Sequence, residues 1–211
     1  MVLHLLQRGQ APESIRMVDF VPPRRADMLT GKAAHVEFVQ ADITSEQATR
    51  AAFDKPWHPS VASLPLTVLH PAAVINFTDR ARTLLHKVNN VNLTGTANVL
   101  SAAKRAGADI FLATSSASIA IRPVKYWIWP WQRNPKHFCQ IIGEDDAYAP
   151  LRDHFEYFGN YAVSKAHAEK LVMAANSENF RTGCIRPANG VYGTRYDHTV
   201  GQYLTRGNVP T

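Results

Sequence analysis

A tyrosine and a lysine stand four positions apart in the segment EYFGNYAVSKAHAEKLV, residues 156–172. The apolar spacing of this segment predicts a helix, so Tyr161 and Lys165 should lie on one helix face. An ammonium group near a phenol favours the phenolate, and it would lower the pKa of Tyr161 toward that of a general base. The spacing alone is weak evidence, because the chain holds seven tyrosines and 23 lysines and arginines.

Serine hydroxyls end a predicted strand at residues 108–116, in the sequence TSSAS. The carboxyl ends of parallel strands form the usual ligand crevice of an open α/β sheet. A hydroxyl from Ser115, Ser116 or Ser118 could there hold a substrate oxygen against Tyr161. For Ser115 and Ser118, capping of the strand end is the plainer alternative.

Short β-branched or aromatic runs alternate with helical segments along the chain. The predicted strands are residues 15–20, 35–43, 66–75, 108–116 and 181–193. Helices are predicted from about residue 79 to 106, and through Tyr161 to about residue 177. This alternation indicates βαβ units, so we expect an α/β fold with a Rossmann-type, doubly wound parallel sheet.

Polar and small residues at the strand ends suit a dinucleotide. Asp19 would accept hydrogen bonds from the adenosine ribose, and Asp42 would lie near the adenine. The turn at residues 70–73, HPAA, would let a cofactor approach the backbone closely. Each feature alone has a structural explanation, and an aspartate after a strand is more often part of a turn or a helix cap, but their order along the chain favours a dinucleotide site.

A long connection at residues 122–153 interrupts the alternation. It interleaves three tryptophans with three basic residues: Trp127, Trp129, Trp131, Lys125, Arg133 and Lys136. Long connections without periodicity are usually functional or disordered. We expect a lid that packs its aromatic residues over an apolar substrate site, and peripheral membrane contact through residues 126–138 is the alternative.

Composition fits one globular domain, with 211 residues, 45% of them hydrophobic and 19% charged. The formal net charge is +6, but the basic residues are scattered, which favours a solvated surface and no nucleic-acid partner. Cys139 and Cys184 are far apart and show no metal-ligand spacing, which fits a reducing compartment.

Seven motifs together resemble the extended short-chain dehydrogenase/reductase superfamily, over nearly the whole chain. They are, in order, VDF, ADIT, HPAAVINF, VNLTGTANVLSAA, ATSSAS, YAVSKAHAEKLV and RPANGVYG. Within the superfamily the chain is most similar to the branch of 3β-hydroxysteroid and sterol-4α-carboxylate 3-dehydrogenases, especially fungal members. The resemblance implies oxidation of a 3-hydroxyl on a hydrophobic, sterol-like substrate, with loss of carbon dioxide where a 4-carboxylate is present. Sugar-nucleotide epimerases or dehydratases and flavonoid-type reductases share the motifs and stay open.

The resemblance also implies roles for single residues. Ser116 would orient the substrate, Tyr161 would be the catalytic base, and Lys165 would lower its pKa and bind the nicotinamide ribose. The implied cofactor-binding residues are Asp19, Asp42, Ile43, His70, Ala72, Ala73, Asn92, Tyr161, Lys165 and Pro187. Asp19 favours NAD, while Arg24 and Arg25 leave NADP open, and no metal is implied.

The chain departs from the family pattern at both ends. A first strand and a GxxGxxG turn are missing, and that strand would lie between residues 15–20 and 66–75. We therefore expect residues 1–195 to form an incomplete NAD(P)-binding domain and residues 196–211 to begin a truncated substrate-binding region. A non-catalytic fragment is a further alternative. For the full-length form we expect a homodimer, in the cytoplasm or on the cytoplasmic face of the endoplasmic reticulum.

Overall fold

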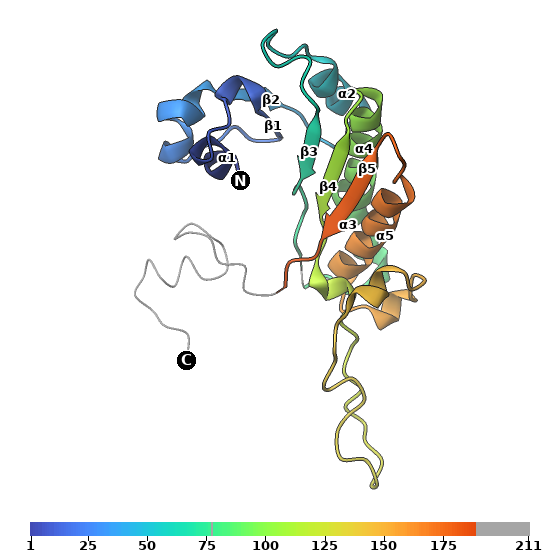
Figure 1. The fold of residues 1–211 in the computed structure, drawn as a ribbon. Helices are drawn as coiled ribbons and strands as arrows, with labels where there is room; N and C mark the ends of the chain where they lie inside the picture. Colours follow the sequence, from blue (N-terminus) through green and yellow to red (C-terminus); the bar gives the residue numbers. More distant parts are fainter. Residues whose placement is uncertain (77, 189–211) are drawn as a thin grey trace.

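The computed structural model describes residues 1–76 and 78–188, which form two parallel β-sheets accompanied by helices (Figure 1). The first sheet pairs β1 (Arg16–Asp19) with β2 (Glu37–Gln40). The second has the order β3 (Thr67–His70), β4 (Ile110–Thr114) and β5 (Arg181–Ile185). The predicted α/β, Rossmann-like fold is confirmed, although each strand is shorter than its predicted range.

Five α-helices are described. They are α1 (Val2–Gln7), α2 (Glu46–Asp54), α3 (Leu85–Asn89), α4 (Thr96–Arg105) and α5 (Asn160–Ala174). The single helix predicted from 79 to 106 is wrong in detail, because helical structure starts at Arg82 and a π-helical turn, Asn90–Gly95, separates α3 from α4. Helix α2 was not predicted, although Ser45 caps it by accepting a hydrogen bond from the Ala48 N–H at 3.2 Å.

The main core lies between the second sheet and the helices behind it in Figure 1. Alternate residues of β4, Phe111 and Ala113, are buried, as the period of two in a strand requires. They pack with Val99 and Ala103 of α4 and with Val172 of α5. Removing the Phe111 ring would cost about 3–5 kcal/mol by the usual scale for large core side chains.

The two sheets are held together through α2. The Arg16 guanidinium on β1 donates to the carbonyls of Lys55 and Pro56, just after α2, at 2.8 and 2.9 Å. Helix α2 in turn packs on α4, and Gly95, the residue before α4, lies close to Ile43: a Cβ atom at Gly95 would be 2.7 Å from the Ile43 side chain. These contacts fix the carboxyl end of β2 against the helical layer.

Strands β1 and β3 belong to different sheets, and in the described residues each has one edge without a strand partner. These are the two strands between which the sequence resemblance places a further strand. The last part of the predicted strand 181–193 and the predicted substrate-binding region 196–211 lie outside the described residues.

The connection between β4 and α5 extends away from the rest of the molecule (Figure 1). Its tryptophan side chains are exposed, so the structure does not show the expected lid packed over a substrate site. Within residues 1–76 and 78–188, no helix combines the length and the apolar content needed to cross a bilayer.

Candidate active site

The start of helix α5 is fixed by hydrogen bonds from Asn160. Its backbone N–H donates to the Asp79 carbonyl at 3.1 Å, and its side-chain amide donates to the Ala81 carbonyl at 2.8 Å. The next residue, Tyr161, is 7% exposed. The helix therefore holds the tyrosine at a defined height above the carboxyl end of β4.

Ser116 lies at that strand end, two residues beyond β4. Its hydroxyl caps a short 3₁₀ turn, Ala117–Ile119, by accepting from the Ser118 N–H at 3.2 Å. The same hydroxyl is hydrogen-bonded to the phenol of Tyr161. The Ala117 N–H donates to the Pro187 carbonyl at 3.0 Å, so the segment after β5 meets the same point.

Lys165 is buried one helical turn after Tyr161, with 5% of its surface exposed. Its Nζ atom donates to the Thr114 carbonyl, the last of β4, at 2.6 Å. Burial lowers the pKa of Lys165 to about 8, against the opposing charge of Glu169. At neutral pH the ammonium is therefore largely charged, and it is held at the strand end by one short hydrogen bond.

Burial raises the pKa of the Tyr161 phenol above its ordinary value, and the hydrogen bond to Ser116 opposes this. The predicted lowering by Lys165 is not found, because burial and the Ser116 hydroxyl are what shift the pKa of this phenol, and Lys165 does not contribute to the shift. The geometry still brings Ser116, Tyr161 and Lys165 to one strand end, as the sequence predicts. A hydroxyl, a phenol and a cation so placed can bind an alcohol oxygen and exchange a proton with it.

His70 and Asn92 are buried, and their side chains form hydrogen bonds within the protein. The Thr96 hydroxyl donates to the Asn92 carbonyl at 2.7 Å, so it must accept from the His70 Nε2–H at 2.9 Å. Burial, then the charge of Lys165, lowers the pKa of His70 to about 4, which keeps the ring neutral.

The side-chain amide of Asn92 is fully engaged within the protein. It donates to the Val74 carbonyl and the Ser164 hydroxyl, at 3.0 and 2.9 Å, and accepts from the Val74 N–H at 2.8 Å. Its contribution to a cofactor site would thus be indirect, by fixing the loop after β3. On that loop Ala72 is exposed and Ala73 is half-buried, which leaves these small side chains accessible.

The predicted adenosine-end residues follow the first sheet. Asp19 and Asp42 are exposed, and each accepts a hydrogen bond from the backbone N–H two residues later, at 3.1 and 2.9 Å. These are turn-stabilising contacts that leave the second carboxylate oxygen of each residue for another donor. Ile43 is partly buried and packs against the main core.

One buried ion pair was missed in the sequence. Glu169, one turn after Lys165, accepts hydrogen bonds from the Arg186 guanidinium through both carboxylate oxygens, at 2.5–3.1 Å. The spacing of Tyr161, Lys165 and Glu169 at four-residue intervals was the available signal, since it places all three on one helix face.

A cavity of about 320 Å³ lies beside α5. Arg122, Arg152, Tyr157, Ala166 and Glu169 are among the residues that line it, whereas Tyr161 and Lys165 are not. We do not assign it to the candidate active site for this reason. In the described part of the chain, no three His, Cys, Asp or Glu side chains gather as they would around a metal ion.

Parallel strands accompanied by helices define a Rossmann-like α/β protein, and the candidate site lies at the carboxyl ends of these strands. Residues 1–208 match the model of the 3-beta hydroxysteroid dehydrogenase/isomerase family, and the chain belongs to that family.

Curated relatives carry corresponding names. The chain is 29% identical, over 203 residues, to a 3 beta-hydroxysteroid dehydrogenase/Delta 5-->4-isomerase of vaccinia virus (strain Western Reserve), covering 91% of this chain and 49% of the relative. It is 25% identical to the decarboxylating sterol-4-alpha-carboxylate 3-dehydrogenase erg26 of Schizosaccharomyces pombe, covering 90% and 47%. The chain thus spans about half the length of the curated relatives it matches.

A solved structure supports the fold alone. The Bordetella bronchiseptica enzyme WbmG in complex with NAD matches with a TM-score of 0.65 and 22% identity, over 98% of this chain and 55% of WbmG. At this level of identity the match says that the strands and helices are arranged alike.

Proposed function

We propose that the protein is an NAD-dependent oxidoreductase that oxidises the 3-hydroxyl of a sterol-like or steroid-like substrate. The observation that carries the proposal is the meeting of Ser116, Tyr161 and Lys165 at the carboxyl end of β4. Because the chain spans about half of its relatives, the proposal concerns the activity of the whole protein.

Each residue has a distinct part in this proposal. The Ser116 hydroxyl would donate to the substrate oxygen and orient it against the Tyr161 phenol. The phenolate of Tyr161 would accept the hydroxyl proton as the carbon–oxygen double bond forms. Lys165, charged at neutral pH, would stabilise that phenolate by its field. Because burial raises the pKa of Tyr161, alcohol oxidation should become faster as the pH increases.

The residues present fit the nicotinamide end of a dinucleotide. A bound NAD would supply the hydride acceptor that this oxidation requires. Lys165, at the carboxyl end of β4, would hold its ribose, and the exposed Ala72 would allow a close approach beside the sheet end. At the far end, Asp19 has a carboxylate oxygen available for the adenosine ribose, which supports NAD over NADP. Arg25 pairs with Asp27, which leaves Arg24 as the exposed cation that could favour NADP.

The substrate class rests on the family to which the chain belongs. A 4-carboxylate next to the newly formed 3-ketone would make a β-keto acid, which loses carbon dioxide without a metal ion. The decarboxylation is therefore part of the proposal only for substrates that carry that group, as the name of the yeast relative suggests.

The test is a substrate comparison with the purified full-length protein and NAD. A 3β-hydroxysteroid, its 4α-carboxylated analogue and a uridine diphosphate sugar are each supplied. Reduced nicotinamide is followed by its absorbance for the two steroids. The sugar nucleotide is followed by chromatography of the product, because an epimerase or dehydratase returns the hydride to the sugar and forms no net reduced nicotinamide. Turnover of either steroid supports the proposal. Turnover of the sugar nucleotide alone would favour the epimerase alternative, and no cofactor binding at all would favour the non-catalytic one.

The proposal includes an oligomeric state, a membrane contact and a location in the cell. The protein would act in the cytoplasm or on the cytoplasmic face of the endoplasmic reticulum, as a homodimer with peripheral membrane contact through residues 126–138. Sedimentation equilibrium of the full-length protein tests the dimer, and a concentration-independent monomer mass would contradict it.

A further inference from the structure

The connection between β4 and α5 contains a hairpin-like excursion, residues 122–143, here named the tryptophan arm. Its two sides pair in antiparallel fashion, with the Lys125 N–H donating to the Lys136 carbonyl at 3.0 Å. At the tip, the Gln132 N–H donates to the Trp129 carbonyl at 2.8 Å, and the Gln132 side chain accepts from the Trp129 N–H at 3.0 Å. These bonds fix the tip as a turn.

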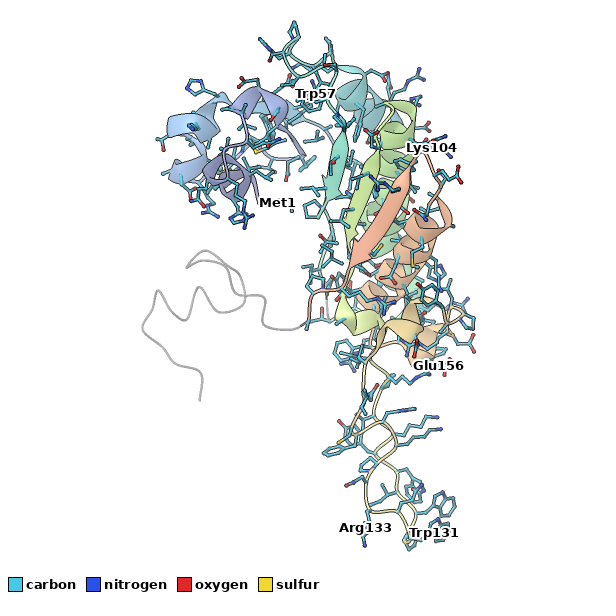
Figure 2. All side chains as sticks on the ribbon, in the orientation of Figure 1. Met1, Trp57, Lys104, Trp131, Arg133 and Glu156 are labelled. Atoms are coloured by element: carbon cyan, nitrogen blue, oxygen red, sulfur yellow. The ribbon has the colours of Figure 1, made fainter. Side chains whose placement is uncertain are left out.

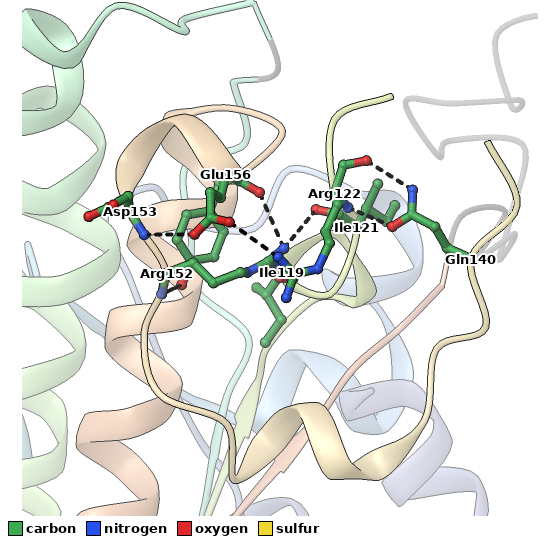
Figure 3. A network of polar contacts seen from close by, with 8 residues as sticks. Ile119, Ile121, Arg122, Gln140, Arg152, Asp153 and Glu156 are labelled. Carbon is green, nitrogen blue, oxygen red and sulfur yellow. Dashed lines mark hydrogen bonds and ion pairs between the residues drawn. The ribbon is translucent and has the colours of Figure 1, made fainter. Parts of the chain in front are cut away.

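The root of the tryptophan arm is clamped to the body (Figure 3). The Gln140 side-chain amide both accepts from the Arg122 N–H, at 2.8 Å, and donates to its carbonyl, at 2.9 Å, which joins the two sides of the arm. The Arg152 guanidinium donates to the carbonyls of Ile119 and Glu156 on the body. The arm therefore projects from a fixed base.

Large aromatic side chains at the far end of the arm are left in solvent. The side chains of Trp127, Trp129 and Trp131 are 78%, 52% and 76% exposed. Trp129 and Trp131 stack on each other, with ring centroids 5.2 Å apart, and Trp127 meets Trp129 edge-on at 6.4 Å. Figure 2 shows Trp131 at the tip, remote from the rest of the chain. Such a concentration of exposed aromatic surface marks an interaction site.

The charge of this region has one sign. Residues 110–143 contain no Asp or Glu. Three cationic side chains, Lys125, Arg133 and Lys136, lie among the tryptophans, and Arg133 is at the tip beside Trp131 (Figure 2). Arg122 at the root faces Glu156 at 3.4 Å, so its charge is balanced. The exposed part of the arm is thus both aromatic and cationic.

We propose that the tip of the tryptophan arm, residues 125–138, docks on the surface of an anionic lipid bilayer. Indole rings settle at the boundary between headgroups and acyl chains, and lysine and arginine are attracted to anionic headgroups. This inference refines the peripheral contact proposed above and is independent of the oxidoreductase activity.

Two other partners suit the arm less well. A nucleic-acid base stacks on an open aromatic face, whereas one face of Trp129 and one face of Trp131 are covered by the other ring. Protein hot spots lie at the centre of a contact patch that a polar rim shields from water, whereas this tip projects freely. A projecting tip can enter a lipid interface without contact from the body.

Vesicle co-sedimentation of the full-length protein, without substrate or cofactor, tests the docking. We expect binding to vesicles of phosphatidylcholine mixed with phosphatidylserine, a blue shift of tryptophan emission, and much weaker binding to phosphatidylcholine alone. The triple variant Lys125→Gln/Arg133→Gln/Lys136→Gln should lose about fivefold in partitioning per charge, or about a hundredfold in all. The variant Trp127→Ser/Trp129→Ser/Trp131→Ser should lose binding and the blue shift.

The matched control is Lys87→Gln/Lys104→Gln/Arg105→Gln, which removes the same charge from exposed positions outside the arm. It should retain binding within a few-fold. Equal binding by all variants, or equal binding to neutral and anionic vesicles, would overturn the proposal. A blue shift of tryptophan emission that appears with RNA, or on raising the protein concentration, and not with vesicles would also overturn the proposal. Vesicle binding is measured without turnover. Loss of the docking proposal would therefore leave the oxidoreductase proposal unaffected, and loss of the oxidoreductase proposal would leave the docking proposal unaffected.

Discussion

The Nζ atom of Lys165 lies 2.6 Å from the backbone carbonyl oxygen of Thr114, so the ammonium is fastened to the last residue of strand β4. This contact joins the helix that carries Tyr161 to the strand end that carries Ser116. It explains how three residues separated by as many as 49 positions, Ser116 and Lys165 at the extremes, lie near one strand end.

We expect Lys165→Ala to impair both turnover and NAD binding in the full-length protein. The change removes the charge that would stabilise a phenolate at Tyr161 and the group placed to hold the nicotinamide ribose. Loss of one or two charge-assisted hydrogen bonds predicts about a tenfold to hundredfold weaker affinity for NAD. Calorimetric titration with NAD measures the affinity directly.

The matched control is Lys170→Ala, on the same helix, where the ammonium donates to the Ala147 carbonyl at 2.6 Å. Its NAD affinity should stay within a few-fold of the unmodified protein. Comparable losses in both variants would mean that the helix, and not the Lys165 ammonium, is what the cofactor depends on.

Asp19→Ala should narrow a preference for NAD over NADP. A carboxylate at this strand end repels a 2′-phosphate and accepts hydrogen bonds from the free ribose hydroxyls. Dissociation constants for both cofactors, measured also for Asp54→Ala as an exposed carboxylate on α2, give the comparison. Equal affinities for NAD and NADP in the unmodified protein would remove the argument and point to Arg24.

Stability should fall when the pH is lowered through the range in which His70 titrates. The folded-state pKa is about 4, below the ordinary value of 6.5, so between these values the unfolded chain binds more protons. The stabilisation is complete above about pH 6.5 and is lost as the pH falls to 4, on the order of 3 kcal/mol.

The variant His70→Gln can still donate to Thr96 but does not titrate. Urea unfolding of both proteins at several pH values should therefore show a stability difference that shrinks on acidification. A difference that stays constant down to pH 4 would show that His70 is not held neutral.

The ion pair of Glu169 and Arg186 predicts that replacing one partner lowers the free energy of unfolding more than replacing both. Glu169→Gln removes the carboxylate that the guanidinium donates to, and breaking one side of a buried pair costs about 3–5 kcal/mol. The double variant Glu169→Met/Arg186→Met should recover much of this stability. The same unfolding free energy for Glu169→Gln and Glu169→Met/Arg186→Met would mean that the two side chains do not stabilise each other.

Local pattern was enough to predict the strands and the meeting of Ser116, Tyr161 and Lys165, because both follow from periodicity and from the parallel-strand rule. The engagement of Asn92 was not predictable in this way, since its partners Val74 and Ser164 are 18 and 72 positions away.

Helix boundaries and the tryptophan arm also escaped prediction, for different reasons. The π-helical turn Asn90–Gly95 has no simple sequence signature, and it interrupts a run whose apolar spacing suits one continuous helix. The two sides of the arm meet at its root through side-chain hydrogen bonds between residues far apart in the sequence, those of Gln140 with Arg122. Aromatic composition alone could not distinguish an arm in solvent from a lid.

The most direct test of the account is turnover of a 3β-hydroxysteroid by the full-length Tyr161→Phe variant with NAD. The variant keeps the ring and loses the hydroxyl that is hydrogen-bonded to Ser116. We predict a fall in turnover of about a hundredfold to ten-thousandfold, with NAD affinity within a few-fold, because only the proton acceptor is removed. Tyr148→Phe, at an exposed position, should have no effect. Unchanged turnover by Tyr161→Phe would contradict the assignment of this site.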